Sequence, residues 1–430
     1  MQPISAVTDG TDGLVGSGSD VADLARRAKA AAPSLAVTAT AVKDAALLAA
    51  ADRLEADVAD LLAANAEDVA RGEAEGMPAG VVDRLRLDEG RLAGMTFGLR
   101  QVADLDDPVG RVTSEWTRPN GLHMSRVRVP LGVVAIIYEN RPNVTSDAFG
   151  LCLKSGNVAF LRGSSGALTS NQAIAASIRS ALVDVGLPAD ALVLVEDGSR
   201  EAAVEFMQQR GFVDCLIPRG GQSLIRSILD NATVPYVIDG DGNCHVYVDE
   251  TADLAMATDI IVNAKVQRPS VCNAAESLVV HAGVVDRFLP LAVEALAGVE
   301  LVGDERARAV VPSIGEAVEA DWSTEYGNLK LSVRVVDDLD EAITHVNETG
   351  SGHSEAIVTG DEAAATRFTS EVDAAAVLVN ASTRFVDGEE FGFGAEIGIS
   401  TQKLHARGPM GLEQLTTEKY IVRGSGQIRG

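Results

Sequence analysis

The spacing of apolar positions changes along the chain, and its first stretch has the spacing of helices. From Val21 to Asn65 the sequence is rich in Ala, contains no Gly and has Pro33 as its only break. Apolar side chains recur in this stretch close to one helical face, at Leu47, Leu54, Val58, Leu61 and Leu62. We therefore expect amphipathic helices at the start of the chain.

Further along, short apolar runs of strand length alternate with helix-like segments. A first series comprises Val133–Tyr138, Val158–Leu161, Ala191–Val195, Val213–Ile217 and Val246–Val248. A second series comprises Leu278–His281, Leu331–Val336, Ala356–Val358 and Ala376–Val379. This alternation is typical of a parallel sheet whose two faces are covered by helices. The sequence thus predicts two consecutive α/β units.

Two further segments have patterns of their own. Thr113–Arg128 is polar and aromatic, and Pro119-Asn120-Gly121 within it is typical of a hairpin turn. The segment Met1–Asp20 is rich in Gly, Ser, Thr and Asp, and has neither the basic region nor the apolar core of a signal peptide. We predict a flexible tail there and a cytoplasmic location.

Composition and charge narrow the function classes. A chain of 430 residues is too long for a single hydrophobic core. The net charge of −26 argues against nucleic acid or an anionic membrane surface as partner. The basic residues are mostly Arg, with only seven Lys. Such an acidic surface suits a cytoplasm of high salt, but it is equally typical of an acidic, Ala-rich bacterial protein.

The cysteines are candidates for chemistry, although a buried structural cysteine is the commoner case. They are Cys152, Cys215, Cys244 and Cys272. None belongs to a CxxC pair and no His lies at metal-ligand spacing, so we expect neither a disulfide framework nor a metal site. Cys272 follows a basic loop interrupted by proline and precedes a predicted strand. Lys265 and Arg268 in that loop would favour its thiolate, the reactive form.

Three polar loops follow predicted strands, namely Glu139–Thr145, Leu161–Gly166 and Pro218–Ser223. Loops with Gly, Arg and Ser at a strand exit bind anions well, because Gly lets backbone N–H groups approach and Arg adds charge. Each alone is more often an ordinary turn. Three at the carboxyl ends of one sheet indicate a nucleotide site. The sequence has no clean GxGxxG, so a dinucleotide would be bound without the usual fingerprint.

A long polar, Gly-rich segment lies near the C-terminus, from Val379 to Pro409. A segment of this length with little helical or strand period is usually functional or disordered, and its interleaved Phe and Ile residues disfavour disorder. Lys403, His405 and Arg407 within it are suited to receive a carboxylate or a phosphate. The alternative is a solvated loop that contacts another subunit.

From about residue 20 to the C-terminus, the chain resembles the γ-glutamyl phosphate reductases, which belong to the aldehyde dehydrogenase superfamily. The resemblance rests on several strings in family order: Tyr138–Thr145, Leu153–Asn157, Ile217–Gly221, Gly242–His245, Arg268–Asn273, Gly352–Ile357 and Gly394–Gly408. Four places depart from the expected pattern. Asn140 stands where Ser is usual, Gly327-Asn328 replaces a Leu-Asp pair, Phe393 replaces Leu, and Ser164 follows Arg-Gly where a second Gly is usual.

The resemblance implies an α/β fold of the aldehyde dehydrogenase type, with two Rossmann-like domains and a small β element for oligomerisation. The implied divisions are a flexible tail at 1–18, a cofactor-binding domain at 19–112 and 129–256, and a catalytic domain at 257–398. The oligomerisation hairpin would occupy 113–128, and the region of the C-terminal strand 399–430.

The activity that the resemblance implies is NADPH-dependent reduction of L-glutamyl 5-phosphate to L-glutamate 5-semialdehyde and phosphate, the second step of proline biosynthesis. Cys272 would be the nucleophile that forms a thioester, and Asn143 would help to hold the oxyanion. The expected cofactor-binding residues are Arg162, Gly163, Arg219, Gly220, Gly221, Ser223 and Glu325. The expected substrate-binding residues are Arg268, Lys403, His405 and Arg407. A homo-oligomer is implied, and the upstream glutamate kinase is a candidate partner.

Three other functions stay open at this point. The chain could be a hydrolytic NAD(P)-dependent aldehyde dehydrogenase, a reductase for another acyl phosphate or acyl-CoA, or a catalytically silent member that serves as a binding module. Hydrolytic members carry a general-base Glu on a loop before the nucleophile. The corresponding segment, Tyr236–His245, contains Asp239 and Asp241 but no Glu. The intact cysteine loop argues against a silent member, and the C-terminal strings argue against a different acyl substrate.

Overall fold

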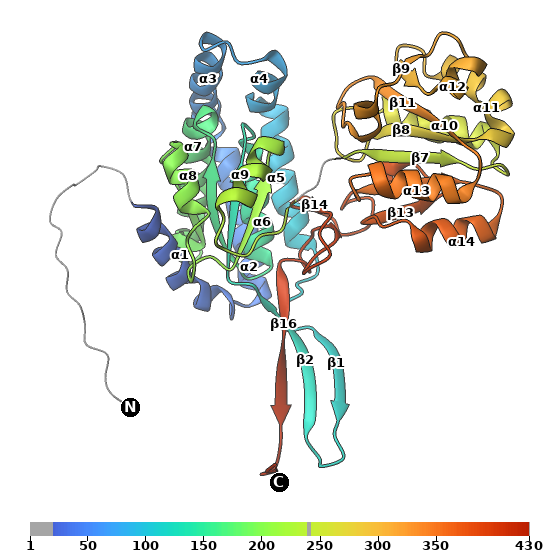
Figure 1. Cartoon of the computed structure of the whole chain (residues 1–430). Coiled ribbons are helices and arrows are strands. Elements are labelled where there is room, and N and C mark those ends of the chain that lie inside the picture. Colours follow the sequence, from blue (N-terminus) through green and yellow to red (C-terminus); the bar gives the residue numbers. More distant parts are fainter. Residues whose placement is uncertain (1–19, 239–241, 430) are drawn as a thin grey trace.

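The structure, a computed structural model, describes residues 20–238 and 242–429. Two α/β bodies lie side by side, and a narrow three-stranded sheet projects beneath them (Figure 1). The predicted tail at residues 1–18, as well as Asp239 and Asp241, lies outside the described residues.

The predicted helical start of the chain is confirmed, and these helices belong to the first body. They are α1 (Val21–Leu35), α2 (Thr40–Ala56), α3 (Val58–Ala74), α4 (Ala79–Leu85) and α5 (Glu89–Asp104). Pro33 lies inside the last turn of α1 rather than at a break. Packing explains this position, because Ala32 and Leu35 on either side of Pro33 are buried in the core and hold the turn in place.

The first sheet is parallel and has the strand order β5-β4-β3-β6. Its strands are β3 (Val133–Tyr138), β4 (Val158–Gly163), β5 (Leu192–Leu194) and β6 (Cys215–Arg219). The helices that follow are α6 (Asn143–Lys154), α7 (Leu168–Asp184), α8 (Arg200–Phe206) and α9 (Gln222–Asn231). Every residue of β3 is buried, as expected for a strand covered on both faces. The strand order reverses between β3 and β6, and sheets of this kind bind ligands at the carboxyl ends beside such a reversal.

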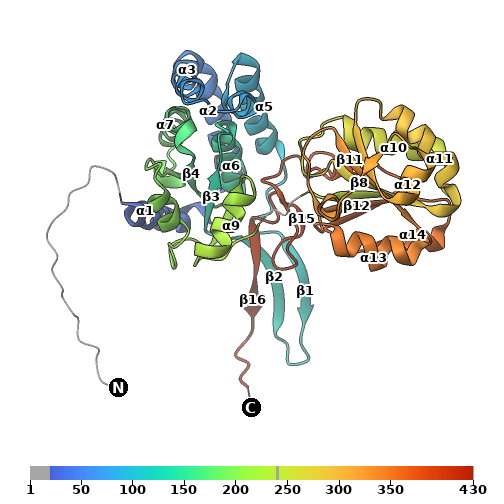
Figure 2. The same cartoon turned by 45° about the horizontal axis from the view of Figure 1, so that its top comes forward.

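The second sheet is also parallel, with the order β10-β9-β11-β8-β7-β12-β13. Its strands are β7 (Cys244–Val248), β8 (Ala275–His281), β9 (Glu300–Gly303), β10 (Gly315–Glu316), β11 (Lys330–Val336), β12 (Ser354–Val358) and β13 (Ala376–Val379). Its helices are α10 (Leu254–Val266), α11 (Ala282–Ala295), α12 (Glu305–Val310), α13 (Leu339–Thr349) and α14 (Glu362–Glu371). The turned view shows these helices packed around the sheet (Figure 2).

The sequence placed the run Val246–Val248 in the first series and the domain boundary after residue 256, and both assignments need correction. Residues Cys244–Val248 form β7, which pairs with β8 and β12 of the second sheet. The change of sheet therefore falls before Cys244. An apolar run predicts a buried strand, but it carries no information about which sheet the strand joins.

The predicted hairpin and C-terminal strand are confirmed as parts of one antiparallel sheet. β1 (Val112–Thr117) and β2 (His123–Pro130) form the hairpin, and β16 (Thr416–Arg423) pairs along the other edge of β2. The turn between β1 and β2 includes Gly121 with a φ of 86°, a conformation that favours glycine.

The chain returns to the first body before it reaches β16. This segment contains the short pair β14 (Ile399–Ser400) and β15 (Gly408–Pro409). Its apolar side chains Ile397, Met410, Leu412 and Leu415 belong to the core of the first body. Short 3-10 helices lie at Ser165–Ala167, Ala189–Ala191, Glu319–Ser323 and Thr383–Phe385. No helix among the described residues is both long and apolar enough to cross a membrane.

Candidate active site

A cavity of about 680 Å³ lies between the two bodies. It forms where the carboxyl ends of β3 and β6 face the segments that lead into β8 and β11 of the second sheet. Its walls are Val81, Arg84, Glu139–Arg141, Arg219–Gln222, Ile225, Arg268, Ser270–Asn273, Glu325, Arg384, Asp387, Glu396 and Ile399. Within the described part of the chain, no group of His, Cys, Asp and Glu side chains is arranged to hold a metal ion.

Cys272 borders this cavity, and its backbone is contacted by Cys244 and Gly242. Cys244 Sγ donates to the Cys272 carbonyl at 3.2 Å, and Gly242 lies directly against the backbone of Cys272. The next residue, Asn273, is buried; its Nδ2 donates to the Val386 carbonyl at 2.9 Å, and its Oδ1 accepts from Arg384. The thiol therefore lies on a fixed loop that faces an open cavity.

The other three cysteines are buried in the two cores. Burial raises the pKa of the Cys152 and Cys244 thiols, and it raises that of Cys215 to about 12. These thiols stay protonated at neutral pH, and a protonated thiol is a poor nucleophile.

Lys265 has a different partner from the one that the sequence predicts. Its Nζ lies 2.5 Å from Glu276 Oε2, and both side chains are fully buried. Glu276 Oε1 also accepts from the backbone N–H of Gly327 at 3.1 Å. Burial raises the pKa of Glu276 to about 7 and lowers that of Lys265. The pair therefore connects the start of β8 to the loop that carries Glu325. Of the two cations that the sequence placed near Cys272, only Arg268 lines the cavity.

Part of the expected cofactor site comes together at the cavity. Arg219 ends β6, and Gly220 and Gly221 lead from it into α9, whose N-terminus attracts anions. The Gly221 N–H donates to Glu139 Oε2 at 3.1 Å, and a side chain added at Gly221 would meet open space. Glu325 lies on the wall formed by the second body. Ser223 is exposed in the first turn of α9 and lies outside the lining residues.

Arg162, Gly163 and Asn143 lie outside the lining residues of the cavity. Arg162 Nη2 donates to the carbonyls of Gly198 at 3.0 Å and Ser199 at 2.8 Å. Gly163, at the end of β4, lies close to the Asn171 side chain. Asn143 begins α6, and its Nδ2 donates to Asp147 Oδ2 at 2.9 Å. Burial raises the pKa of Asp147 to about 6.

The three predicted substrate-binding residues of the C-terminal segment also lie outside the lining residues. Lys403 and Arg407 both pair with Asp373, at 2.5 and 2.8 Å, and Asp373 lies between α14 and β13 of the second body. His405 is exposed, and its Nε2 lies 2.7 Å from the Gln414 carbonyl. In this arrangement the basic residues connect the C-terminal segment to the second body.

Two departures from the family pattern touch each other beyond the carboxyl ends of β3 and β4. Ser164 Oγ donates to Asn140 Oδ1 at 2.7 Å, and the Asn140 N–H donates to Ser164 Oγ at 3.0 Å. Asn140 has a φ of 32°, in the left-handed range that Asn tolerates better than most residues. The Ser164 side chain therefore supports the loop on which Arg141 follows Asn140.

Sequence reasoning missed six charged residues of the cavity: Arg84, Glu139, Arg141, Arg384, Asp387 and Glu396. Arg141 lay inside a loop that the sequence singled out, and its place after a strand was the available signal. Arg384, Asp387 and Glu396 all lay within the long C-terminal segment. Arg84 belongs to a helix of the first body, where nothing in the pattern marks it.

Glu396 gives a prediction about pH. Burial, reinforced by Asp387, raises its pKa from an ordinary 4.5 to about 7, so folding favours the protonated carboxyl. The free energy of unfolding should therefore fall as pH rises from about 4.5 to about 7. In Glu396→Gln this contribution is absent, and the variant should gain on the order of 2 kcal/mol relative to the parent between pH 5 and pH 8.

Urea unfolding of both proteins at several pH values measures this difference. Exposed Glu389→Gln, in the same segment, is the control and should show no such trend. A stability difference that stays constant from pH 5 to pH 8 would contradict the raised pKa of Glu396.

Comparisons with known proteins identify the class that this fold and cavity define. The chain matches the aldehyde dehydrogenase family model over residues 14–319 and 331–421. It is 57% identical over 406 residues to the gamma-glutamyl phosphate reductase of Moorella thermoacetica, covering 94% of this chain and 97% of the relative. It is 54% identical over 412 residues to that of Thermobifida fusca, covering 95% and 99%.

A solved structure agrees with these relatives. The crystal structure of gamma-glutamyl phosphate reductase from Thermotoga maritima matches with a TM-score of 0.94 at 46% identity, covering 95% of this chain and all of the other. The fold is thus that of an aldehyde dehydrogenase. Within that class, the chain belongs to the gamma-glutamyl phosphate reductase family.

Proposed function

We propose that this protein reduces L-glutamyl 5-phosphate to L-glutamate 5-semialdehyde and phosphate with NADPH, the second step of proline biosynthesis. The observation that carries the proposal is the position of Cys272, whose thiol borders a cavity shared with Arg268, the Gly220-Gly221 turn and Glu325. Relatives more than 50% identical over nearly their whole length support the choice of substrate.

The proposed reaction begins with the Cys272 thiolate, which attacks the acyl carbon of the substrate. A carbon–sulfur bond forms, the carbon–oxygen bond to phosphate breaks, and the product on the enzyme is a thioester. When bound, NADPH supplies the hydride that reduces this thioester. The resulting thiohemiacetal loses the Cys272 thiolate and leaves the aldehyde. One proton is consumed overall, and phosphate is released.

Two groups are suited to stabilise the oxyanion that forms on the acyl oxygen. One is the backbone N–H of Cys272. The other is the Asn143 amide, two residues beyond the lining residue Arg141; its nitrogen carries two protons, so one N–H can donate to Asp147 while the second can reach toward the acyl oxygen. Asp387 and Glu396 are suited to the substrate ammonium, because Glu396 Oε2 is buried without a hydrogen-bond partner among the described residues.

The cavity fits a dinucleotide on its first-body side. Gly221 leaves open space at the N-terminus of α9, and Arg219 adds positive charge for the cofactor phosphates. Glu325, opposite, is suited to the hydroxyls of a ribose. Ser223 lies in the first turn of α9. Arg162 and Gly163 would act through the loop after β5, which Arg162 holds by two hydrogen bonds.

These positions support separate roles for the two bodies. In this proposal the first body binds the cofactor, and the second body, from β7 onward, carries the nucleophile. The sheet β1-β2-β16 would join copies of the chain into a homo-oligomer, since its outer strand β16 exposes Tyr420 and Val422. The upstream glutamate kinase remains a candidate partner, and we expect the enzyme to act in the cytoplasm.

One observation favours a second candidate function, the hydrolytic aldehyde dehydrogenase. Glu396 lies in the cavity with a pKa of about 7, which suits a general base that activates water. A hydrolytic enzyme would release free glutamate, whereas a reductase running in reverse must transfer the acyl group to phosphate.

The reverse reaction separates the two candidates. Oxidation of glutamate 5-semialdehyde with NADP⁺ should require added phosphate, or arsenate in its place, because the thioester then has no other acceptor. Rates of NADPH formation with and without phosphate, at fixed ionic strength, measure the requirement. Steady NADPH formation and free glutamate in phosphate-free buffer would establish the hydrolytic function instead.

A further inference from the structure

Three arginines from separate parts of the chain meet at the cavity. Arg84 lies near the end of α4, Arg141 follows β3, and Arg268 belongs to the loop that carries Cys272. Within residues 20–238 and 242–429, none of the three guanidinium groups forms an ion pair or a hydrogen bond. Three unpaired cations around one space are unusual in a folded protein, because like charges repel unless an anion lies between them.

The three cations are close enough to influence one another. Burial lowers the pKa of Arg141, and the nearby charges of Arg219, Arg84 and Arg268 lower it further. Glu139 is the acid that acts on Arg141 in the opposite direction, and it already accepts a hydrogen bond from the Gly221 N–H. At Arg141, therefore, three neighbouring cations act against the single acid Glu139.

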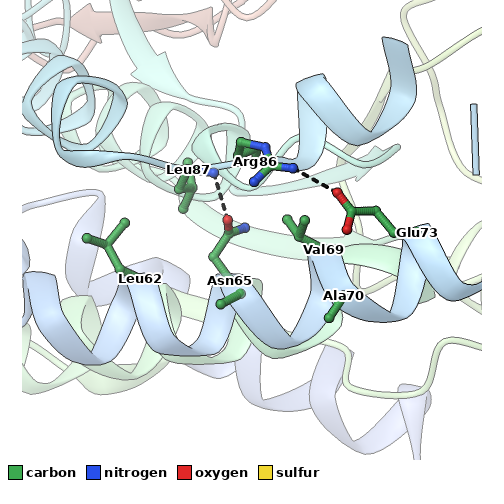
Figure 3. Close-up of a pocket in the computed structure, with 8 residues that line it drawn as sticks. Leu62, Asn65, Val69, Ala70, Glu73, Arg86 and Leu87 are labelled. Atoms are coloured by element: carbon green, nitrogen blue, oxygen red, sulfur yellow. Dashed lines mark hydrogen bonds and ion pairs between the residues drawn. The ribbon is translucent and has the colours of Figure 1, made fainter. Parts of the chain in front are cut away.

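The segment that carries Arg84 is firmly anchored, as Figure 3 shows for the adjoining groove between α3 and Arg86-Leu87, the residues that follow α4. The buried Asn65 donates to the Leu85 carbonyl at 2.8 Å and accepts from the Leu87 N–H at 2.7 Å. Arg86, which points into this groove, pairs with Glu73 at 2.9 Å. These contacts fix the backbone on the carboxyl side of Arg84, from which its side chain reaches the cavity.

We propose that Arg84, Arg141 and Arg268 bind the phosphate group of the acyl phosphate substrate, a role that rests on the function proposed above. The phosphate is bonded through one oxygen to the carbon that Cys272 attacks, so its binding site must adjoin the nucleophile loop, where Arg268 lies. The α-carboxylate of the substrate is at the far end of the molecule. A phosphate dianion also has enough oxygens for several guanidinium forks, whereas a carboxylate has two.

This site has a function in both directions of the reaction. In reduction, the three arginines stabilise the charge that the departing phosphate gains as its bond to carbon breaks. In oxidation, they hold inorganic phosphate beside the thioester, where it attacks in place of water. The site therefore determines that the acyl group goes to phosphate.

The test is the Michaelis constant for inorganic phosphate in the reverse reaction. Arg141→Gln and Arg84→Gln should each raise it by about tenfold or more. The constants for NADP⁺ and glutamate 5-semialdehyde should stay within about twofold, which distinguishes this site from one for the cofactor phosphates. Arg86→Gln, on the adjacent residue, is the matched control and should leave all three constants unchanged. A rise in the constant for NADP⁺ with no change for phosphate would overturn the proposal.

A second measurement does not depend on turnover. Inorganic phosphate should slow the alkylation of Cys272 by iodoacetamide in a saturable way in the parent protein and in Arg86→Gln, but not in Arg141→Gln. Sulfate-free buffer of constant ionic strength excludes general screening. If phosphate gives the parent no protection, the site is refuted. If protection occurs but the parent fails to reduce glutamyl phosphate, the site stands and the proposed substrate is wrong.

Discussion

Replacing Cys272 by Ala is expected to lower reductase activity by at least about 10³-fold. The reason is chemical: without the thiolate no thioester forms, and the hydride would have to reach an acyl phosphate directly. The fold should survive, because Cys272 is only partly buried and makes no core contact. Activity with glutamyl phosphate generated in situ, together with the thermal midpoint, measures both effects.

Cys215→Ala and Cys152→Ala are the controls, since both thiols are buried in the first body away from the cavity. They should keep nearly full activity and lose about 1 kcal/mol of stability each. Cys244→Ala should have an intermediate effect, because Cys244 donates a hydrogen bond to the Cys272 carbonyl. More than a trace of activity in Cys272→Ala would exclude a covalent mechanism.

Gly242→Ala is expected to disable the enzyme although residue 242 carries no catalytic group. A Cβ at this position would lie 1.9 Å from the Cys272 carbonyl oxygen and 2.5 Å from its Cα. Both neighbours are backbone atoms, so the nucleophile loop itself would have to move. A displacement of about 1 Å in a reacting group costs roughly 10²-fold in rate, and we expect a loss of that size in kcat.

The thermal midpoint of Gly242→Ala should also fall by several degrees, because the loop and β7 can no longer pack together. Gly94→Ala is the matched control: Gly94 is exposed on helix α5, and nothing lies within 4 Å of an added Cβ. That change should raise stability by up to about 1 kcal/mol without altering activity. Normal kcat in Gly242→Ala would show that Gly242 does not constrain the position of Cys272.

The fold was predictable where the local sequence pattern itself determines the structure. The run Val133–Tyr138 is apolar throughout because both faces of β3 are covered, and the turn at Pro119–Gly121 determined the hairpin. The sheet to which Val246–Val248 belongs was not predictable in this way. Its partners, β8 and β12, are determined by packing between distant segments, which a local pattern does not record.

The candidate site was predictable only in part, because local composition does not record which distant residues meet in the fold. Cys272 and the Gly220-Gly221 turn stand in loops whose composition suits their chemistry, and the structure brings them to one cavity. Arg84 has no such context in the sequence, since a helical Arg is usually solvated. Lys403 and Arg407 have a composition that suits anion binding, but a single acid, Asp373, pairs with both.

The return of the chain to the first body has a consequence for synthesis on the ribosome. Met410, Leu412 and Leu415 complete a core whose strands were translated far earlier, and β16 can pair with β2 only after residue 423 has been synthesised. Until then the nascent chain exposes the part of the first core that these side chains later cover, and one edge of β2 is unpaired. Both features favour aggregation. The second body, by contrast, is continuous from β7 to β13, so its core can form before the core of the first body is complete.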